Sequence, residues 1–83
     1  MEENKSVIDT RAFPDIWKSL APAQRGFLRY TIARRTTVTR QTIANWARGG
    51  RPVHKATRES VAKIIRETMG IRTSSELLFP EGR

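Results

Sequence analysis

Apolar residues recur along the chain at the spacing of short amphipathic helices, without the alternation that marks strands. A first helix is predicted to open at Pro14, because proline suits the first helical turn. Its apolar face consists of Ile16, Trp17 and Leu20. The pair Ala21-Pro22 ends this helix, because a residue that precedes proline disfavours helical angles.

A second helix is predicted from about Pro22 to Arg35, where four residues form one stripe: Phe27, Leu28, Thr31 and Ile32. The run 36–39 follows, and its β-branched side chains resist helix formation. We therefore expect a short turn there, with Thr39 as the N-cap of the next helix.

The third predicted helix spans about Arg40 to Arg48, and Ile43, Trp46 and Ala47 share one of its faces. The remaining surface carries polar side chains: Arg40, Gln41, Thr42, Asn45 and Arg48. The pair Gly49-Gly50 ends this helix, because glycine accepts the left-handed conformation common at helix C-termini.

A fourth helix is predicted from about Lys55 to Met69, closed by Gly70, and a short fifth from Ser74 to Leu78, capped by Ser74 or Ser75. The apolar stripe of the fourth is Val61, Ile64, Ile65 and Met69, and the residues that close the core are Leu77, Leu78 and Phe79. The pattern predicts an all-α bundle of four or five helices over residues 13–80. A flexible arm over 1–12 and a tail over 81–83 are expected to flank it.

Composition adds a strong positive charge to this picture. The chain of 83 residues is short enough for one domain and carries a formal net charge of +8. Twelve of its sixteen cations are arginine, which forms bidentate bonds to phosphate and to guanine edges. This bias favours a nucleic-acid partner, although a solvated basic surface without a partner has the same composition.

Several classes of protein are disfavoured. No cysteine is present, and His54 alone cannot build a metal site. No apolar run approaches the ~18 residues of a membrane span, and no signal peptide is visible, so a cytoplasmic protein is expected. Asp15 and Glu59 are isolated, and no glycine-rich phosphate loop occurs, so we expect neither an enzyme nor a cofactor or small-molecule substrate.

The segment from Arg29 to Arg48 is the most informative. It predicts two helices joined by about three residues at a steep, fixed angle. Ala33 is small where the helices cross, and Val38 fills the turn. The other residues that set the crossing are Ile32 and Ile43, which lie beneath it, and Trp46, which anchors the back of the third helix.

This pattern resembles the helix-turn-helix of the phage repressor and Cro family, a lambda-repressor-like fold. The likeness covers roughly residues 14–80. It is carried by Ile32-Ala33, by 38–43, by 45–49, and by the downstream segments 50–52, 69–71 and 75–79. Each piece is weakly specific, and their order and spacing give the signal.

The resemblance implies a DNA-binding transcriptional regulator of the repressor type that works at the nucleoid. The start of the third helix would enter the major groove, and the base-reading residues would be Arg40, Gln41, Thr42 and Asn45. The phosphate contacts would be Arg29, Thr39, Arg48, Arg51 and Lys55. A homodimer on a two-fold DNA site is expected, with a dimer surface at the last two helices, where Leu77, Leu78 and Phe79 are available.

Two residues depart from the family pattern. Thr37 occupies the turn position where the family usually has glycine, and a left-handed conformation would cost threonine about 1–2 kcal/mol. We therefore expect a small backbone shift in the turn. Thr36 replaces a usual apolar residue, so the second helix is expected to end earlier.

Two other functions remain open. A basic protein that binds RNA or the nucleoid without sequence preference would use charge alone. An antitoxin or anti-repressor module would keep the fold and bind a protein, although its polar, cationic reading face suits that function less well.

Overall fold

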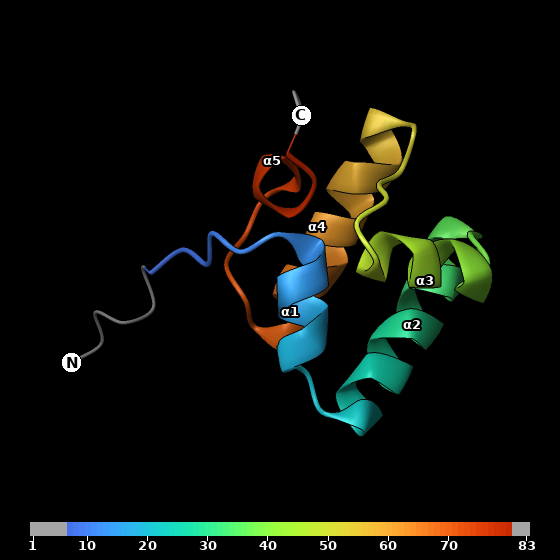
Figure 1. Cartoon of the computed structure of the whole chain (residues 1–83), viewed down its shortest axis with the longest axis horizontal. Helices are drawn as coiled ribbons and strands as arrows, with labels where there is room; N and C mark the ends of the chain where they lie inside the picture. Colours follow the sequence, from blue (N-terminus) through green and yellow to red (C-terminus); the bar gives the residue numbers. More distant parts are fainter. Residues whose placement is uncertain (1–6, 81–83) are drawn as a thin grey trace.

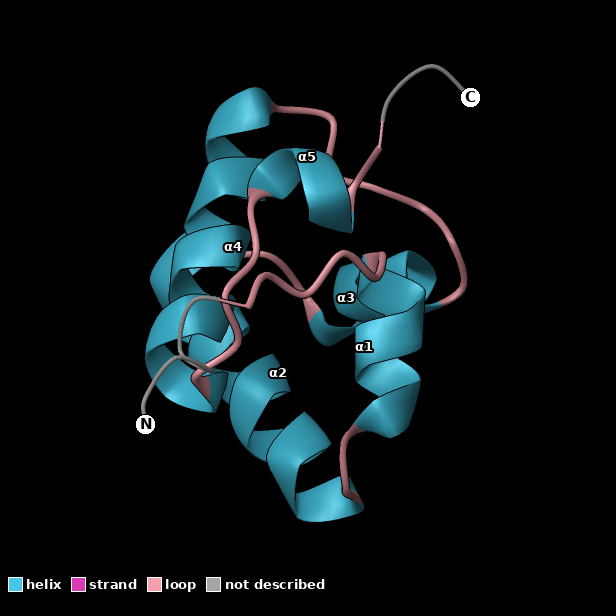
Figure 2. Ribbon diagram, turned by 90° about the vertical axis from the view of Figure 1, so that its left-hand side faces the viewer, coloured by secondary structure: helices cyan, strands magenta, loops and turns pink. Residues whose placement is uncertain are grey.

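Five α-helices follow one another between residues 7 and 80, the part of the chain that the computed structural model describes, and no strand occurs there. They are α1 (Phe13–Ser19), α2 (Pro22–Thr36), α3 (Arg40–Ala47), α4 (Lys55–Met69) and α5 (Ser75–Leu78) (Figure 1). α1 packs on α3, α2 packs on α3 and α4, and α4 packs on α5 (Figure 2). The prediction of a small all-α domain is confirmed, and the expected tail 81–83 lies outside the described residues.

The first helix begins one residue before the predicted start at Pro14, at Phe13. Phe13 is fully buried and lies among three other aromatic rings. Its ring centroid is 5.7 Å from that of Trp17, 6.1 Å from that of Trp46 and 5.6 Å from that of Phe79. These contacts join α1, α3 and the segment after α5. Phe13 is therefore central to the core, although the sequence pattern did not assign it to the core.

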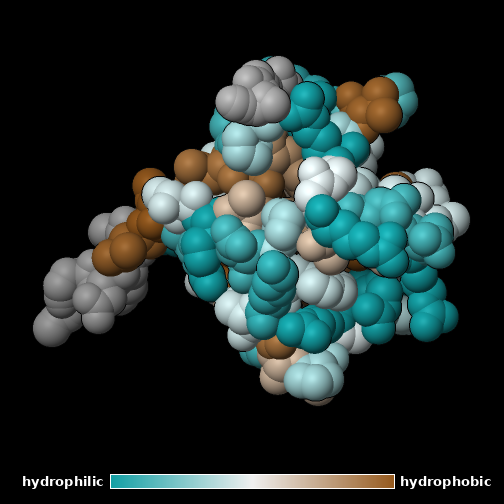
Figure 3. Space-filling view, in the orientation of Figure 1, coloured by the Kyte–Doolittle hydropathy of each residue, from teal (hydrophilic) through white to brown (hydrophobic). Residues whose placement is uncertain are grey.

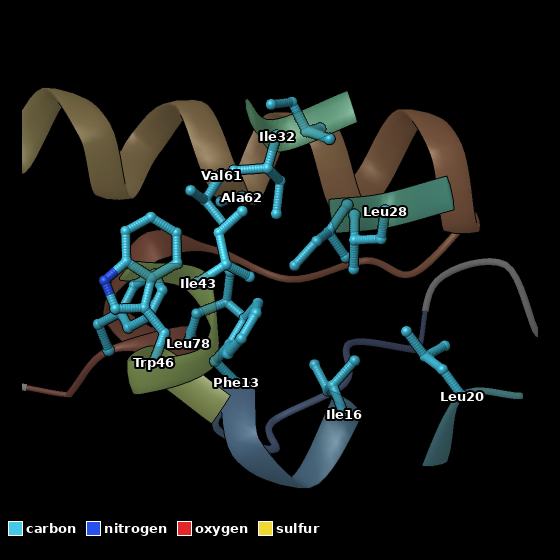
Figure 4. Close-up of a cluster of buried hydrophobic side chains, with 13 residues drawn as sticks. Phe13, Ile16, Leu20, Leu28, Ile32, Ile43, Trp46, Val61, Ala62 and Leu78 are labelled. Carbon is cyan, nitrogen blue, oxygen red and sulfur yellow. The ribbon is translucent and has the colours of Figure 1, made fainter. Parts of the chain in front are cut away.

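The core draws on all five helices (Figure 4). Its buried residues are Phe13, Ile16, Leu20, Leu28, Ile32, Ile43, Trp46, Val61, Ala62, Ile64, Ile65, Leu78 and Phe79. Trp17, Ala33, Val38 and Met69 are partly buried against it. The inward faces predicted for the third and fourth helices are therefore confirmed.

Two expectations about buried surfaces are wrong. Phe27 does not belong to the inward stripe of α2: it is 54% exposed, because the ~100° step per residue turns it away from the buried Leu28. At the other end of the chain, Leu78 and Phe79 are 1% and 2% exposed. They are packed in the core of their own domain, which confirms that they close it, and they are not available as a dimer surface.

The segment before α1 is tied to the loop after α4. The Asp9 backbone N–H donates to the Arg72 carbonyl oxygen over 2.8 Å. The Asp9 carboxylate accepts hydrogen bonds from Arg11, and these hydrogen bonds lower the pKa of Asp9. The flexibility expected for 7–12 stays a prediction, and the rest of the expected arm lies outside the described residues.

The turn between α2 and α3 shows that both expectations about Thr36 and Thr37, the two residues that depart from the family pattern, are wrong. α2 does not end early, since Thr36 is its last residue and the Thr36 hydroxyl donates to the Ile32 carbonyl oxygen over 2.6 Å. Thr37 adopts the left-handed conformation, with φ 62° and ψ 16°, so the turn is not shifted. Its backbone N–H donates to the Ala33 carbonyl oxygen over 3.0 Å, which closes the helix end. Threonine thus tolerates a conformation that favours glycine.

The left-handed Thr37 makes the turn a place where stability can be gained. A residue with a Cβ atom is strained in the left-handed conformation and glycine is not. Thr37→Gly should therefore raise the free energy of unfolding by about 0.5–1 kcal/mol. Gly70 ends α4 with a similar φ of 69°, and an added Cβ would meet nothing within 4 Å. Gly70→Thr should therefore lower stability by about 1–2 kcal/mol. Urea unfolding followed by circular dichroism measures both, and a destabilised Thr37→Gly would show that this strain is absent.

Candidate nucleic-acid interface

The N-terminus of α3 is fixed by its cap. Thr39 is extended, with φ −85° and ψ 163°, and its hydroxyl accepts from the Thr42 backbone N–H over 3.1 Å. The two hydroxyls of Thr39 and Thr42 also lie 3.0 Å apart. The predicted N-cap is therefore confirmed. The cap holds both threonine side chains at the helix end, where they define the entry of the chain into α3.

The two sides of α3 differ in burial. Ile43 and Trp46 are 0% and 2% exposed, and both face the core (Figure 4). The exposed residues are Arg40, Gln41, Asn45 and Arg48, and Thr42 is half-buried. α3 lies at one end of the molecule (Figure 1), and the surface in that region is mostly hydrophilic (Figure 3). The predicted polar residues of α3 thus reach solvent while its apolar ones hold it in place.

A tight turn ends α3. Gly49 has φ 116°, a conformation that side chains rarely adopt. The Gly50 N–H donates to the Asn45 carbonyl oxygen over 2.9 Å, and a Cβ on Gly50 would lie only 3.1 Å from that oxygen. The pair Gly49-Gly50 ends α3, as the sequence predicted, with Gly49 supplying the positive φ and Gly50 the close approach to Asn45. The Arg48 guanidinium lies 3.4 Å from the Asn45 side-chain oxygen, so these two exposed side chains are neighbours.

A hollow of about 290 Å³ separates α2 from the start of α3. It is lined by Gly26, Arg29, Tyr30, Ala33 and Arg40. Arg29 and Arg40, predicted to contact a phosphate and a base respectively, are thus brought to one hollow. The Arg29 guanidinium also lies 5.8 Å from the centroid of the Trp17 ring, a cation–π contact that supports its position.

Arg51 and Lys55 lie beside the C-terminal segment instead. The Arg51 guanidinium donates to the Pro80 carbonyl oxygen over 2.7 Å. Lys55 is exposed and lines a second hollow, of about 370 Å³, with Arg58, Ser75, Glu76 and Phe79. Of the predicted phosphate contacts, these two belong to a separate group from Arg29, Thr39 and Arg48, which flank α3.

The structure also gives several arginines a role that composition does not reveal. The Arg25 side chain donates to the carbonyl oxygens of Trp17 and Lys18, at the end of α1. Arg58 donates to carbonyl oxygens of the loop before α4, and Arg66 to that of Thr73. These guanidiniums satisfy backbone carbonyl oxygens at the end of α1 and in the loops before α4 and α5. Part of the arginine excess therefore stabilises loops.

Sequence reasoning missed Tyr30, which lines the hollow beside Arg29 and Arg40. The signal that could have located it is helical spacing: Tyr30 follows Gly26 by four residues and precedes Ala33 by three, and all three line the hollow.

Within residues 7–80, no group of three or more histidine, cysteine, aspartate or glutamate side chains is placed to hold a metal ion. No helix of that range has the length and apolar character needed to cross a membrane. Comparisons with protein-family models, with curated proteins and with solved structures find no match to this chain. The function must therefore be inferred from the chain's own residues.

The cap of α3 gives a direct test of how the interface is held. Thr39→Ala removes the oxygen that accepts the Thr42 N–H, so the free energy of unfolding should fall by about 1 kcal/mol. Thr39→Ser keeps that oxygen and should retain most of the stability. Urea unfolding of the three proteins makes the comparison, and equal stability of the alanine variant would show that the cap does not hold α3.

Proposed function

We propose that this chain is a sequence-specific binder of double-stranded DNA that regulates transcription. α2, the turn 37–39 and α3 would act as a helix-turn-helix of the phage repressor and Cro type. The observation that carries the proposal is that Arg40, Gln41 and Asn45 are exposed together on α3, while Ile43 and Trp46 bury its other side. A polar reading face on a firmly anchored helix is what major-groove recognition requires.

The exposed side chains have the chemistry that base edges need. Arginine binds guanine O6 and N7 with two parallel hydrogen bonds, and Gln41 and Asn45 carry amides that match adenine N6 and N7. An α-helix with its side chains is about 10–12 Å across, and the major groove is about 12 Å wide, so the eight-residue α3 can enter it. Thr42, bonded to the cap, would contribute its methyl group to contacts at the groove edge.

Phosphate contacts would fix the position of α3. Arg29 at the hollow, the cap residue Thr39 and the C-cap residue Arg48 flank the reading face. Arg51 and Lys55 would contact the backbone further along the duplex, and within residues 7–80 the one hydrogen bond of the Arg51 side chain, to Pro80, leaves other guanidinium N–H groups for such a contact. Such contacts position a protein without reading sequence.

Selection from a pool of random duplexes tests the proposal. The chain should enrich one short motif, and a two-fold symmetric motif would support binding as a homodimer with half-sites about one helical turn apart. Arg40→Ala should cost about 1–3 kcal/mol on the enriched duplex and much less on random duplexes. Arg51→Ala should weaken both duplexes alike and reduce the salt slope by about one.

Lys63→Ala is the matched control, because it removes one exposed positive charge from α4 that is not among the proposed DNA contacts. It should change affinity less than either arginine variant. If no motif is enriched and all three variants lose the same affinity, only charge-driven binding is left, and the proposal is contradicted.

A further inference from the structure

A row of exposed side chains runs along the outer face of α2. Phe27 and Tyr30 are 54% and 58% exposed, and Ala23 and Arg34 are exposed as well. The four follow one another at intervals of four, three and four residues, which is the spacing of a seam between two packed helices. We call these four residues the α2 stripe. Nothing in residues 7–80 covers it.

The stripe is partly organised in advance for binding. The Arg34 guanidinium lies 5.7 Å from the centroid of the Tyr30 ring and donates to the Tyr30 hydroxyl over 3.1 Å. This pairing restricts two long side chains before a partner arrives, which reduces the entropy lost on binding. Aromatic residues and arginine are also the residue types that carry most binding energy at protein interfaces.

Charge identifies the kind of partner. The segment Pro22–Thr36 contains four arginines and no aspartate or glutamate. Arg35 is paired with Glu67 of α4, at 3.0 Å, and Arg25 is bonded to carbonyl oxygens of α1. Arg34 lies in the stripe without a carboxylate partner among the contacts of the described residues. Two copies of this helix face to face would repel each other, whereas a segment that carries carboxylates would be attracted.

We propose that the α2 stripe is the docking surface for an acidic amphipathic helix of a partner protein. Apolar side chains of the partner would pack on Phe27 and Tyr30, with Ala23 allowing close approach, and a carboxylate would pair with Arg34. This inference goes beyond DNA binding, because none of the four stripe residues is a proposed base-reading or phosphate-binding residue. Tyr30 also borders the hollow that Arg29 and Arg40 line, so the stripe adjoins the proposed DNA interface.

The probe is a fluorescein-labelled peptide of about 15–18 residues, made of leucine, alanine and glutamate with leucines at helical seam spacing. Anisotropy is measured with the full chain and without DNA. The peptide should bind to the chain, and a higher salt concentration should weaken this binding. A peptide of the same composition in scrambled order, and one with lysine for glutamate, should bind at least about tenfold more weakly.

Variants locate the site. Phe27→Ser and Tyr30→Ser should each weaken peptide binding by about tenfold or more, and Arg34→Gln should reduce its salt dependence. Val53→Ser is the matched control, because Val53 is 84% exposed on the loop before α4, and it should change nothing. Circular dichroism should show that all four variants stay folded, since every changed residue is exposed.

Three results would overturn the proposal. A scrambled peptide that binds as tightly as the ordered one would leave only charge attraction. Phe27→Ser and Tyr30→Ser could leave peptide binding unchanged while weakening duplex binding, which would assign the stripe to the DNA interface. Sedimentation could show a dimer that Phe27→Ser dissociates, which would assign the stripe to a second copy of this chain.

Discussion

The burial of Ile43 and Trp46 is the interaction on which the rest of the structure depends. Both lie in the core, where Trp46 meets the rings of Phe13 and Phe79 at 6.1 and 5.8 Å. A helix of only eight residues has little stability of its own, so tertiary packing must fix its orientation. Once these two side chains are buried, helical geometry turns Arg40, Gln41 and Asn45 toward solvent. The proposed reading face is therefore a consequence of the core.

The two ends of α3 complete this constraint. Thr39 holds the first turn through the Thr42 N–H, and Gly49-Gly50 reverses the chain directly after the last turn. The left-handed Thr37 sets the angle at which the chain leaves α2. α3 is thus bounded by local backbone geometry and anchored by distant side chains, which together give it one position.

Periodicity and turn chemistry predicted the helices almost to the residue, because caps and glycines are local signals. The wrong predictions concern contacts between segments that are distant in the sequence. The sequence offers Leu78 and Phe79 both to the core and to a dimer surface, because nothing in their neighbourhood shows that Phe13 lies against Phe79. The pattern places Phe27 inward because an apolar residue beside Leu28 fits a broad helical stripe, yet Phe27 is 54% exposed. Motif order predicts the site residues. All of them are exposed except Arg29 and Thr42, which are half-buried, and what they bind stays a prediction.

Amide chemical shifts of the ¹⁵N-labelled chain, recorded with and without an enriched duplex, test the central claim most directly. The account predicts the largest changes at residues 39–45, smaller ones near Arg29 and Arg51, and none in the buried part of α4. Chemical-shift changes concentrated on α4 and α5, with α3 unaffected, would contradict the account. DNA would then not use the face of α3 that lies opposite the buried Ile43 and Trp46.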